Sequence, residues 1–401
     1  MTGPDENCEE HVMLPPRPLE ARKGRGAVSN IQGRYEVNGR ESFDDGWIQE
    51  DEEGEPAPFK TQVTDEFAKT ILSRNASPDI PFNVSLNPYR GCEHGCIYCF
   101  ARPTHSYLGL SPGLDFESRI FAKVNAPDLL RRELSKPSYV PESIAIGVNT
   151  DAYQPCERDY KITRRVLEVL NECEHPAAMI TKNSLIERDI DLLAPMAGRN
   201  QAIAAITLTT LDPEISRTLE PRAAAPARRL RTIRTLVDAG IPVRVSVAPV
   251  IPFVTEPELE RVLEAAREAG ALSAHYVVLR LPWEVNPLFQ QWLQAHFPDR
   301  AQRVMNRVRE MRGGKDYDSD FSLRMHGEGV WADLIRQRFE KAVKRLGMNL
   351  TSGRFAELDT SRFRRPLVVP PSAGKQNGNA TASWTCFRDN ISPALSDIAT
   401  G

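Results

Sequence analysis

The sequence lacks several features that would place the protein in a membrane or outside the cell. It has no run of about 18 apolar residues, which excludes a transmembrane helix. Residues 1–10 are polar and acidic, unlike a secretory signal. Seven cysteines, three of them clustered, fit a reducing compartment better than a disulfide framework. We therefore expect a cytoplasmic protein without membrane attachment.

A strong net charge is absent as well. The formal net charge is −3, so no overall field draws the protein to nucleic acid, and any basic surface must be local. A hydrophobic content of 41% and a charged content of 26% are ordinary for a globular protein. The length of 401 residues allows one large α/β domain with extensions, or two domains.

What the sequence does contain is a cluster of three cysteines, Cys92, Cys96 and Cys99, with the spacing C-x3-C-x2-C. Closely spaced thiolates hold iron–sulfur clusters, and a [4Fe–4S] cluster normally takes four of them. With three protein ligands, one iron keeps an open coordination site. Gly91 and Gly95 let the loop fold around a ligand without a Cβ clash.

Two other interpretations of this loop stay open at this point, a structural zinc site and three unrelated buried cysteines. A structural zinc site usually shows four ligands in two pairs, and the sequence has no second C-x2-C pair. His94 could complete a zinc site, although it lies inside the tight turn. The spacing therefore favours a cluster.

Apolar segments of strand length alternate with amphipathic segments over most of the chain. The expected strands are 83–89, 119–124, 143–148, 177–181, 203–208, 243–250 and 275–279, and the expected helices are 126–135, 160–172, 187–195, 227–239 and 256–269. Apolar strands separated by helices indicate βαβ units and a parallel sheet. We count about six such units after the cysteine loop begins, fewer than a closed TIM barrel has.

Composition divides the chain into four predicted segments. They are a largely disordered N-terminal segment at 1–60, a core domain at 61–285, a C-terminal helical extension at 286–365 and a disordered tail at 366–401. We expect the basic stretch 22–26 to be a solvated tail, and 61–75 to form a short helix. The extension contains three expected helices, 286–296, 301–311 and 329–346.

Polar side chains follow three of the predicted strands, and in parallel α/β folds functional residues come from the carboxyl ends of strands. Thr150 and Asp151 follow the second core strand, Lys182 follows the third, and Thr207 begins a polar run at the end of the fourth. Each position is also compatible with an ordinary structural role: an Asn/Asp turn, a solvated surface cation, and the preference of threonine for strands.

The cysteine spacing and its setting resemble the radical S-adenosylmethionine (SAM) superfamily. Together with N-T-D-x-x-Q-P at 149–155, T-K-N-S at 181–184 and A-P-V-I-P at 248–252, they look like its spore photoproduct lyase-related, DNA repair photolyase-like branch. The resemblance covers about residues 80–285. It implies an α/β fold, a partial (β/α)6 TIM-type barrel with a C-terminal helical extension and flexible termini.

The resemblance also implies two cofactors, a [4Fe–4S] cluster and SAM bound at its open iron. One electron from the cluster cleaves SAM reductively, and the resulting 5′-deoxyadenosyl radical abstracts hydrogen from a substrate. By position, Thr150, Lys182 and Thr207 match the side chains that hold SAM in that branch, and Asp151 lies in the motif that holds the SAM amino group. The implied protein partner is an electron donor such as flavodoxin or ferredoxin.

The sequence departs from spore photoproduct lyases where hydrogen is transferred. Those enzymes carry a cysteine at the position of Val148, and two tyrosines where this chain has Tyr98 and Phe100. Valine and phenylalanine cannot relay a hydrogen atom. Cys156 is a replacement candidate, with a buried bystander as the alternative. The branch's thymine-dimer-type repair is therefore not expected here.

A second class of function also fits part of the sequence, a non-enzymatic nucleic-acid-binding protein stapled by a metal or a cluster. Arg222 opens a basic stretch at 222–234 and lies just after the fourth strand, where it could contact a phosphate or a substrate. The charged outer face of a helix would account for the same arginines. Three ligands and polar strand ends favour the enzyme, with nucleic acid as one substrate class to test.

Overall fold

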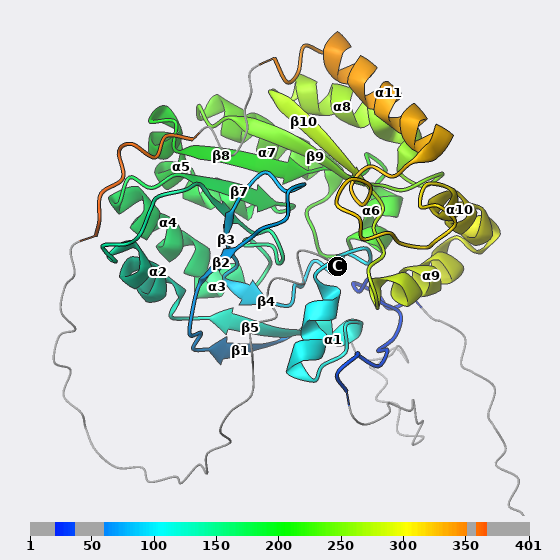
Figure 1. The fold of residues 1–401 in the computed structure, drawn as a ribbon, viewed down its shortest axis with the longest axis horizontal. Helices are drawn as coiled ribbons and strands as arrows, with labels where there is room; N and C mark the ends of the chain where they lie inside the picture. Colours follow the sequence, from blue (N-terminus) through cyan, green and yellow to red (C-terminus); the bar gives the residue numbers. More distant parts are fainter. Residues whose placement is uncertain (1–20, 37–59, 351–357, 367–401) are drawn as a thin grey trace, which may run out of the picture.

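The computed structural model describes residues 21–36, 60–350 and 358–366, which form a curved sheet covered by helices on one side (Figure 1). Most of the predicted disordered N-terminal segment, and the tail from 367 to 401, lie outside the described residues.

Seven strands form the main sheet, in the order β10-β9-β8-β7-β6-β3-β2. Their bounds are β2 Leu72–Arg74, β3 Val84–Leu86, β6 Ile144–Ile146, β7 Ala177–Thr181, β8 Ala202–Thr207, β9 Val243–Val250 and β10 Ser273–Val278. All are parallel to their neighbours except β2, which runs antiparallel to β3. Because β10 and β2 are separate edges, the described sheet is not a closed barrel. This confirms the predicted open arrangement of six parallel strands.

The helices form because their apolar residues recur at helical spacing and face this sheet. In α4 (Ile162–Glu172) the buried side chains include Ile162, Val166 and Leu170. The other long helices of this outer layer are α2 Ala126–Leu134, α5 Ile190–Gly198, α7 Pro226–Asp238, α8 Leu259–Glu268 and α11 Gly329–Arg345. Together with the apolar strands they bury one large hydrophobic core.

The three expected C-terminal helices are present, but they pack in two different places. In α11, Phe339 packs against Tyr276 of β10 in a tilted arrangement, with ring centroids 4.7 Å apart, and Arg338 pairs with Glu260 of α8 at 2.7 Å. In contrast, α9 (Val285–His296) and α10 (Pro298–Glu310) form a second core that includes Ile97 of the cysteine loop. Helix α11 therefore completes the outer layer, while α9 and α10 support the loop.

The expected helix at 61–75 is wrong, because this stretch forms two strands. Strand β1 (Gln62–Glu66) pairs in parallel with β5 (Arg119–Lys123), and β4 (Tyr89–Arg90) pairs with the other side of β5. These pairings to remote segments decided the conformation. Short elements were also missed, namely α1 Leu114–Ser118, α3 Glu157–Tyr160, α6 Pro213–Leu219, and 3₁₀ helices at Arg102–Leu108, Ser184–Asp189 and Glu256–Glu258.

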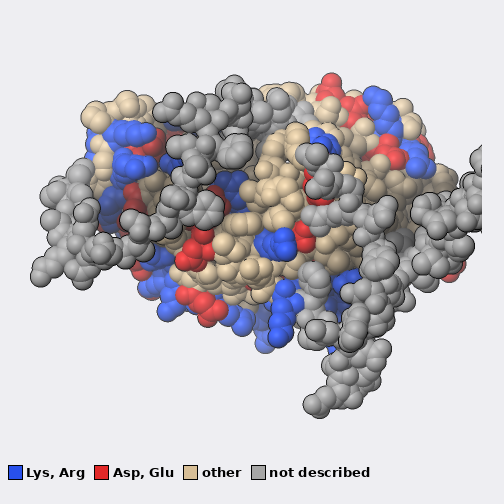
Figure 2. All heavy atoms as spheres, turned by 90° about the horizontal axis from the view of Figure 1, so that it is seen from below, with Lys and Arg blue, Asp and Glu red and all other residues tan. Residues whose placement is uncertain are grey.

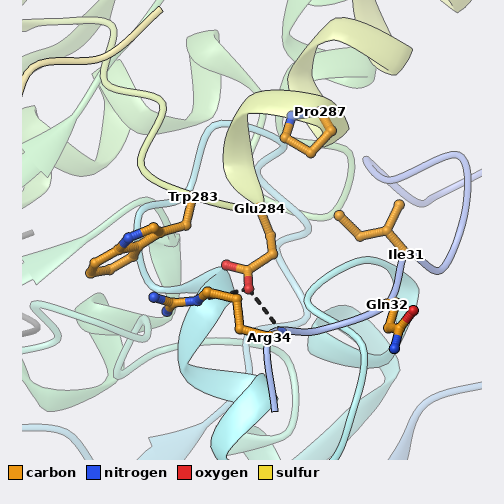
Figure 3. A pocket seen from close by; sticks show the side chains of 6 residues that line it. All are labelled: Ile31, Gln32, Arg34, Trp283, Glu284 and Pro287. Atoms are coloured by element: carbon orange, nitrogen blue, oxygen red, sulfur yellow. Dashed lines mark hydrogen bonds and ion pairs between the residues drawn. The ribbon is translucent and has the colours of Figure 1, made fainter. Parts of the chain in front are cut away.

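Residues 25–34, which we call the N-terminal strap, lie against the core between α1 and α9 (Figure 1). Residues 22–24 are exposed, as expected of a solvated segment, but Arg25 is only 4% exposed, and its guanidinium donates to the Glu117 carbonyl at 2.7 Å. At the other end, Arg34 pairs with Glu284 at 2.9 Å beside a pocket of about 350 Å³ (Figure 3). The burial of Arg25 could not be predicted because its partner Glu117 lies 92 residues further along the chain.

Segments next to the two edges of the sheet make specific contacts. Arg324, between α10 and α11, forms two hydrogen bonds of 2.6 and 2.7 Å with Asp79, between β2 and β3. The Asn349 side chain accepts from the Ala274 amide and donates to its carbonyl, which covers part of the free edge of β10. None of the helices in the described ranges is long and apolar enough to cross a bilayer.

Candidate active site

The residues predicted at the strand ends lie together around the cysteine loop, residues 91–100. Asp151, after β6, accepts hydrogen bonds from the Thr181 hydroxyl at 2.7 Å and from the Lys182 amide at 2.7 Å, both at the end of β7. The Thr150 hydroxyl donates to the carbonyl of Tyr89, just before the loop, at 2.9 Å. The structure thus brings Thr150, Asp151 and Lys182 together beside the cysteine loop.

Two glycines give the cysteine loop its shape. Gly91 and Gly95 have φ of +74° and +66°, a conformation that favours glycine. A Cβ at Gly91 would lie 2.9 Å from the Phe116 carbonyl oxygen. The Cys92 amide donates to that same oxygen at 2.9 Å, and the Cys99 amide donates to the Cys96 carbonyl at 3.2 Å. The backbone is therefore held in a fixed turn around the cysteines.

A fully buried arginine holds one side of the loop. The Arg102 guanidinium donates to the carbonyls of Gly95 at 2.9 Å and Cys96 at 2.8 Å, and its charge is paired with Glu117. Both side chains of this ion pair are 0% exposed. Glu117 also accepts from the amides of Gly26 at 3.0 Å and Ala27 at 2.8 Å, so it joins the strap to the loop.

The loop is also held by the segment after β6. Gln154 accepts from the Glu93 amide at 2.9 Å and donates to the Gly91 carbonyl at 3.2 Å. The buried Glu93 carboxylate accepts from the Cys156 amide at 2.8 Å and from Arg222 at 2.9 Å. The structure thus places both Cys156 and Arg222 against the loop, and Arg222 is ion-paired there.

The three cysteine thiols are enclosed by this framework. Cys92 and Cys96 are each 7% exposed and Cys99 is partly buried. Burial raises the pKa of all three thiols, that of Cys96 to about 12 although Lys182 acts in the opposite direction. Metal binding requires thiolates, so iron would supply the stabilisation that the buried thiolates lack.

Three thiols on one glycine-shaped loop fit the ligand set of a [4Fe–4S] cluster with one open iron. Among the residues that the structure describes, no three Cys, His, Asp or Glu side chains converge as a single metal ion would require. A [4Fe–4S] cluster binds each thiolate at a different iron, so its ligands surround a larger group.

His94, which could have completed a zinc site, is directed at protein groups instead. It is 0% exposed, its Nδ1 lies 3.2 Å from Asp151 Oδ2, and its Nε2 lies 3.2 Å from Asn183 Nδ2. Burial alone would raise the pKa of Asp151, but the His94 imidazole and the Lys182 amide lower it to about 2. The ionised Asp151 therefore organises the loop and the end of β7.

Lys182 is the one predicted site residue with a charge that its surroundings leave unpaired. Its ammonium makes no ion pair or hydrogen bond within the described ranges, and it lies 5.9 Å from the centroid of the Tyr98 ring. Burial alone would lower the pKa of Lys182, but Cys96, Glu220 and Asp151 together raise it. Lys182 is therefore a cation beside the cysteine loop.

Tyr98 and Thr207 both form hydrogen bonds with a buried ion pair, Glu220 and Arg229. The Tyr98 hydroxyl donates to Glu220, which also pairs with Arg229; Glu220 and Arg229 are each 1% exposed. Arg229 donates to the Thr207 carbonyl at 3.0 Å. The Thr207 side chain is buried at the end of β8. The pair thus connects the cysteine loop to β8 and α7.

Comparison with known proteins shows the family to which the chain belongs. The model of the Radical SAM superfamily matches residues 86–266. An uncharacterised protein of Mycobacterium tuberculosis is 36% identical over 234 residues, which cover 58% of this chain and 68% of that protein. The chain belongs to the radical SAM superfamily. It is thus a radical SAM enzyme, which argues against the non-enzymatic alternative.

Other proteins are similar to this chain at lower sequence identity. An uncharacterised protein of Methanocaldococcus jannaschii is 24% identical over 223 residues, covering 56% of this chain and 80% of that protein. A solved structure of a spore photoproduct lyase mutant is similar with a TM-score of 0.49 and 12% identity, covering 79% of this chain and 87% of that chain.

Several residues that build this candidate site were not selected as site residues from the sequence. Arg102, Glu117, Glu220 and Arg229 are charged, and a charged residue in a loop or on a helix is normally assigned to the surface. No local pattern distinguishes them from solvated residues. Gln154 had a signal, because it belongs to the polar run after the second core strand.

Proposed function

We propose that Cys92, Cys96 and Cys99 hold a [4Fe–4S] cluster, and that SAM binds beside them at the ends of the strands. The observation that carries this proposal is the three-thiol loop fixed by Gly91 and Gly95, with an unpaired lysine next to it. When bound, the cluster supplies one electron that cleaves SAM to methionine and a 5′-deoxyadenosyl radical, which abstracts hydrogen from the substrate.

The chain's own residues have separate tasks in this proposal. Lys182 attracts the SAM carboxylate as a point charge, and the backbone around Thr150 and the side chain of Thr207 contact the rest of the SAM molecule. Asp151 orients Lys182 through the hydrogen bond to its amide. The buried framework keeps water away from the thiolates, which strengthens these electrostatic contacts.

The electron is supplied by a partner such as flavodoxin or ferredoxin. The substrate class stays open, with nucleic acid as one class to test. On the face in Figure 2, acidic and basic side chains are interspersed.

The proposal is tested by anaerobic reconstitution of the full-length protein with iron and sulfide. We expect about four irons per chain, and formation of 5′-deoxyadenosine and methionine from SAM when a reductant is added. Omission of the reductant is the control. An iron-free protein, or one that binds iron but leaves SAM intact under reduction, would contradict the proposal.

Replacement of Lys182 tests the SAM contacts. A charge-assisted hydrogen bond contributes about 1.5–3 kcal/mol, so Lys182→Met should raise the KM for SAM by about 10-fold or more, while iron content stays at the wild-type value. The matched control is Lys136→Met, since Lys136 is 52% exposed and paired with Glu133. An unchanged KM in steady-state measurements of 5′-deoxyadenosine would remove Lys182 from the SAM site.

A further inference from the structure

A further cation without a counter-ion in the described residues lies beside the cysteine loop. Arg280 follows β10, and its guanidinium carbon is 5.7 Å from the centroid of the Phe100 ring. Its polar contacts are weak and neutral, Met325 Sδ at 3.6 Å and the Tyr317 hydroxyl at 3.3 Å. Its Nε atom is buried and has no hydrogen-bond partner in the described part of the chain.

Three fully buried arginines of this protein differ from the partly buried Arg280. Arg102, Arg229 and Arg324 are each 0–1% exposed, and each is paired with a carboxylate, those of Glu117, Glu220 and Asp79. Within the described residues, no carboxylate lies within ion-pair distance of Arg280. The fold thus supplies counter-ions to these three buried arginines, whereas Arg280 and its neighbour Arg312 have none within the described residues.

The neighbouring Arg312 adds a second positive charge instead of neutralising the charge of Arg280. Arg312 is 1% exposed, bonds the carbonyls of Leu279 at 2.9 Å and Leu323 at 2.7 Å, and leaves its own Nε without a partner. Burial, and then the charge of Arg280, lower the pKa of Arg312 to about 10. The Asp318 carboxylate raises the pKa of Arg312, but it is itself paired with Lys315 at 3.1 Å.

Lys182 and Arg280, two cations without counter-ions in the described part of the chain, each lie next to an aromatic ring of the cysteine loop. Lys182 is next to the Tyr98 ring and Arg280 is next to the Phe100 ring, and these rings precede and follow Cys99. If Lys182 serves the SAM carboxylate, Arg280 is free to serve a different anion. An uncompensated charge that is partly buried is unfavourable, so its retention points to a ligand.

We propose that Arg280 binds an anionic oxygen group of the substrate, a carboxylate or a phosphate, and so positions the substrate beside Phe100. A guanidinium fork suits two parallel hydrogen bonds to such a group, and the unpartnered Nε–H is one available donor. This inference rests on the proposed function for the location of the radical chemistry. The anion site itself is observable without turnover.

The test uses inorganic phosphate and acetate as minimal anions on full-length protein, both reconstituted and as purified, with sodium chloride at matched ionic strength. We expect phosphate or acetate to raise the wild-type Tm saturably, and Arg280→Gln to lose most of that shift. Arg336→Gln, which removes a 54% exposed arginine, should keep it. Whichever anion gives the larger shift identifies the class. No saturable shift in the wild type, or a full shift in Arg280→Gln, overturns the proposal.

Two further measurements distinguish a substrate anion from SAM and from a purely structural role of Arg280. With saturating SAM present, the phosphate or acetate shift should persist; its loss would assign Arg280 to SAM and overturn the substrate assignment. Arg280→Leu should unfold at an equal or higher temperature than the wild type, because it removes an uncompensated charge, whereas a marked decrease would make Arg280 structural. If reconstitution yields no iron, the proposed function fails while the anion test on the purified chain can still be read.

Discussion

Cys96→Ala is expected to lose both the cluster and reductive SAM cleavage. Cys96 is a buried ligand candidate at the centre of the three-cysteine loop, and two remaining thiolates would not hold a [4Fe–4S] cluster with one open iron. The measurements are iron and sulfide content after anaerobic reconstitution, and 5′-deoxyadenosine formation under reduction. We expect background values for both.

The matched control is Cys173→Ala, because Cys173 is 1% exposed but packs in the main hydrophobic core at the end of α4. It should bind as much iron as the wild type. If Cys96→Ala keeps its iron and cleaves SAM, the assignment of the three cysteines as cluster ligands is wrong.

Arg102→Met should be strongly destabilising and should also impair cluster binding. The substitution leaves Glu117 buried without its counter-ion, which costs about 3–5 kcal/mol for a buried pair. It also removes the donors to the carbonyls of Gly95 and Cys96. Chemical denaturation of the purified protein measures the free energy of unfolding, and iron content after reconstitution measures the effect on the loop.

An exposed ion pair provides the comparison for this effect. Arg131 and Glu172 are 34% and 48% exposed, so Arg131→Met should change the free energy of unfolding by about 0–1 kcal/mol. The double variant Arg102→Met with Glu117→Gln should recover part of the lost stability, because no unpaired charge remains. A single Arg102→Met variant as stable as Arg131→Met would show that the buried pair does not hold the loop.

Prediction from the sequence succeeded where the information was local. The alternation of apolar strands and amphipathic helices has a period that depends only on neighbouring residues, so the parallel sheet and its helices could be placed. It failed at 61–75, where pairing with β3 and β5 decided the conformation. It also failed at Arg25, whose burial depends on Glu117.

The site shows the same division between local and remote information. Thr150, Asp151, Lys182 and Thr207 could be selected because parallel strands bring their carboxyl ends together. Their separate roles could not be inferred, because they depend on what each side chain meets. Asp151 is surrounded by protein donors, whereas the Lys182 ammonium has no hydrogen-bond acceptor or counter-ion in contact among the described residues.

By itself, the sequence determined the order of the parallel strands and the long helices between them, the three cysteines on one loop, and the polar residues at the strand ends, because these follow from spacing along the chain. The tertiary structure decided which charges are compensated. Arg102 has Glu117 as its partner, while Arg280 has no carboxylate in the described residues. The reason is that the electrostatic free energy of a side chain depends on burial and on remote neighbours, and neither can be read from the residues next to it.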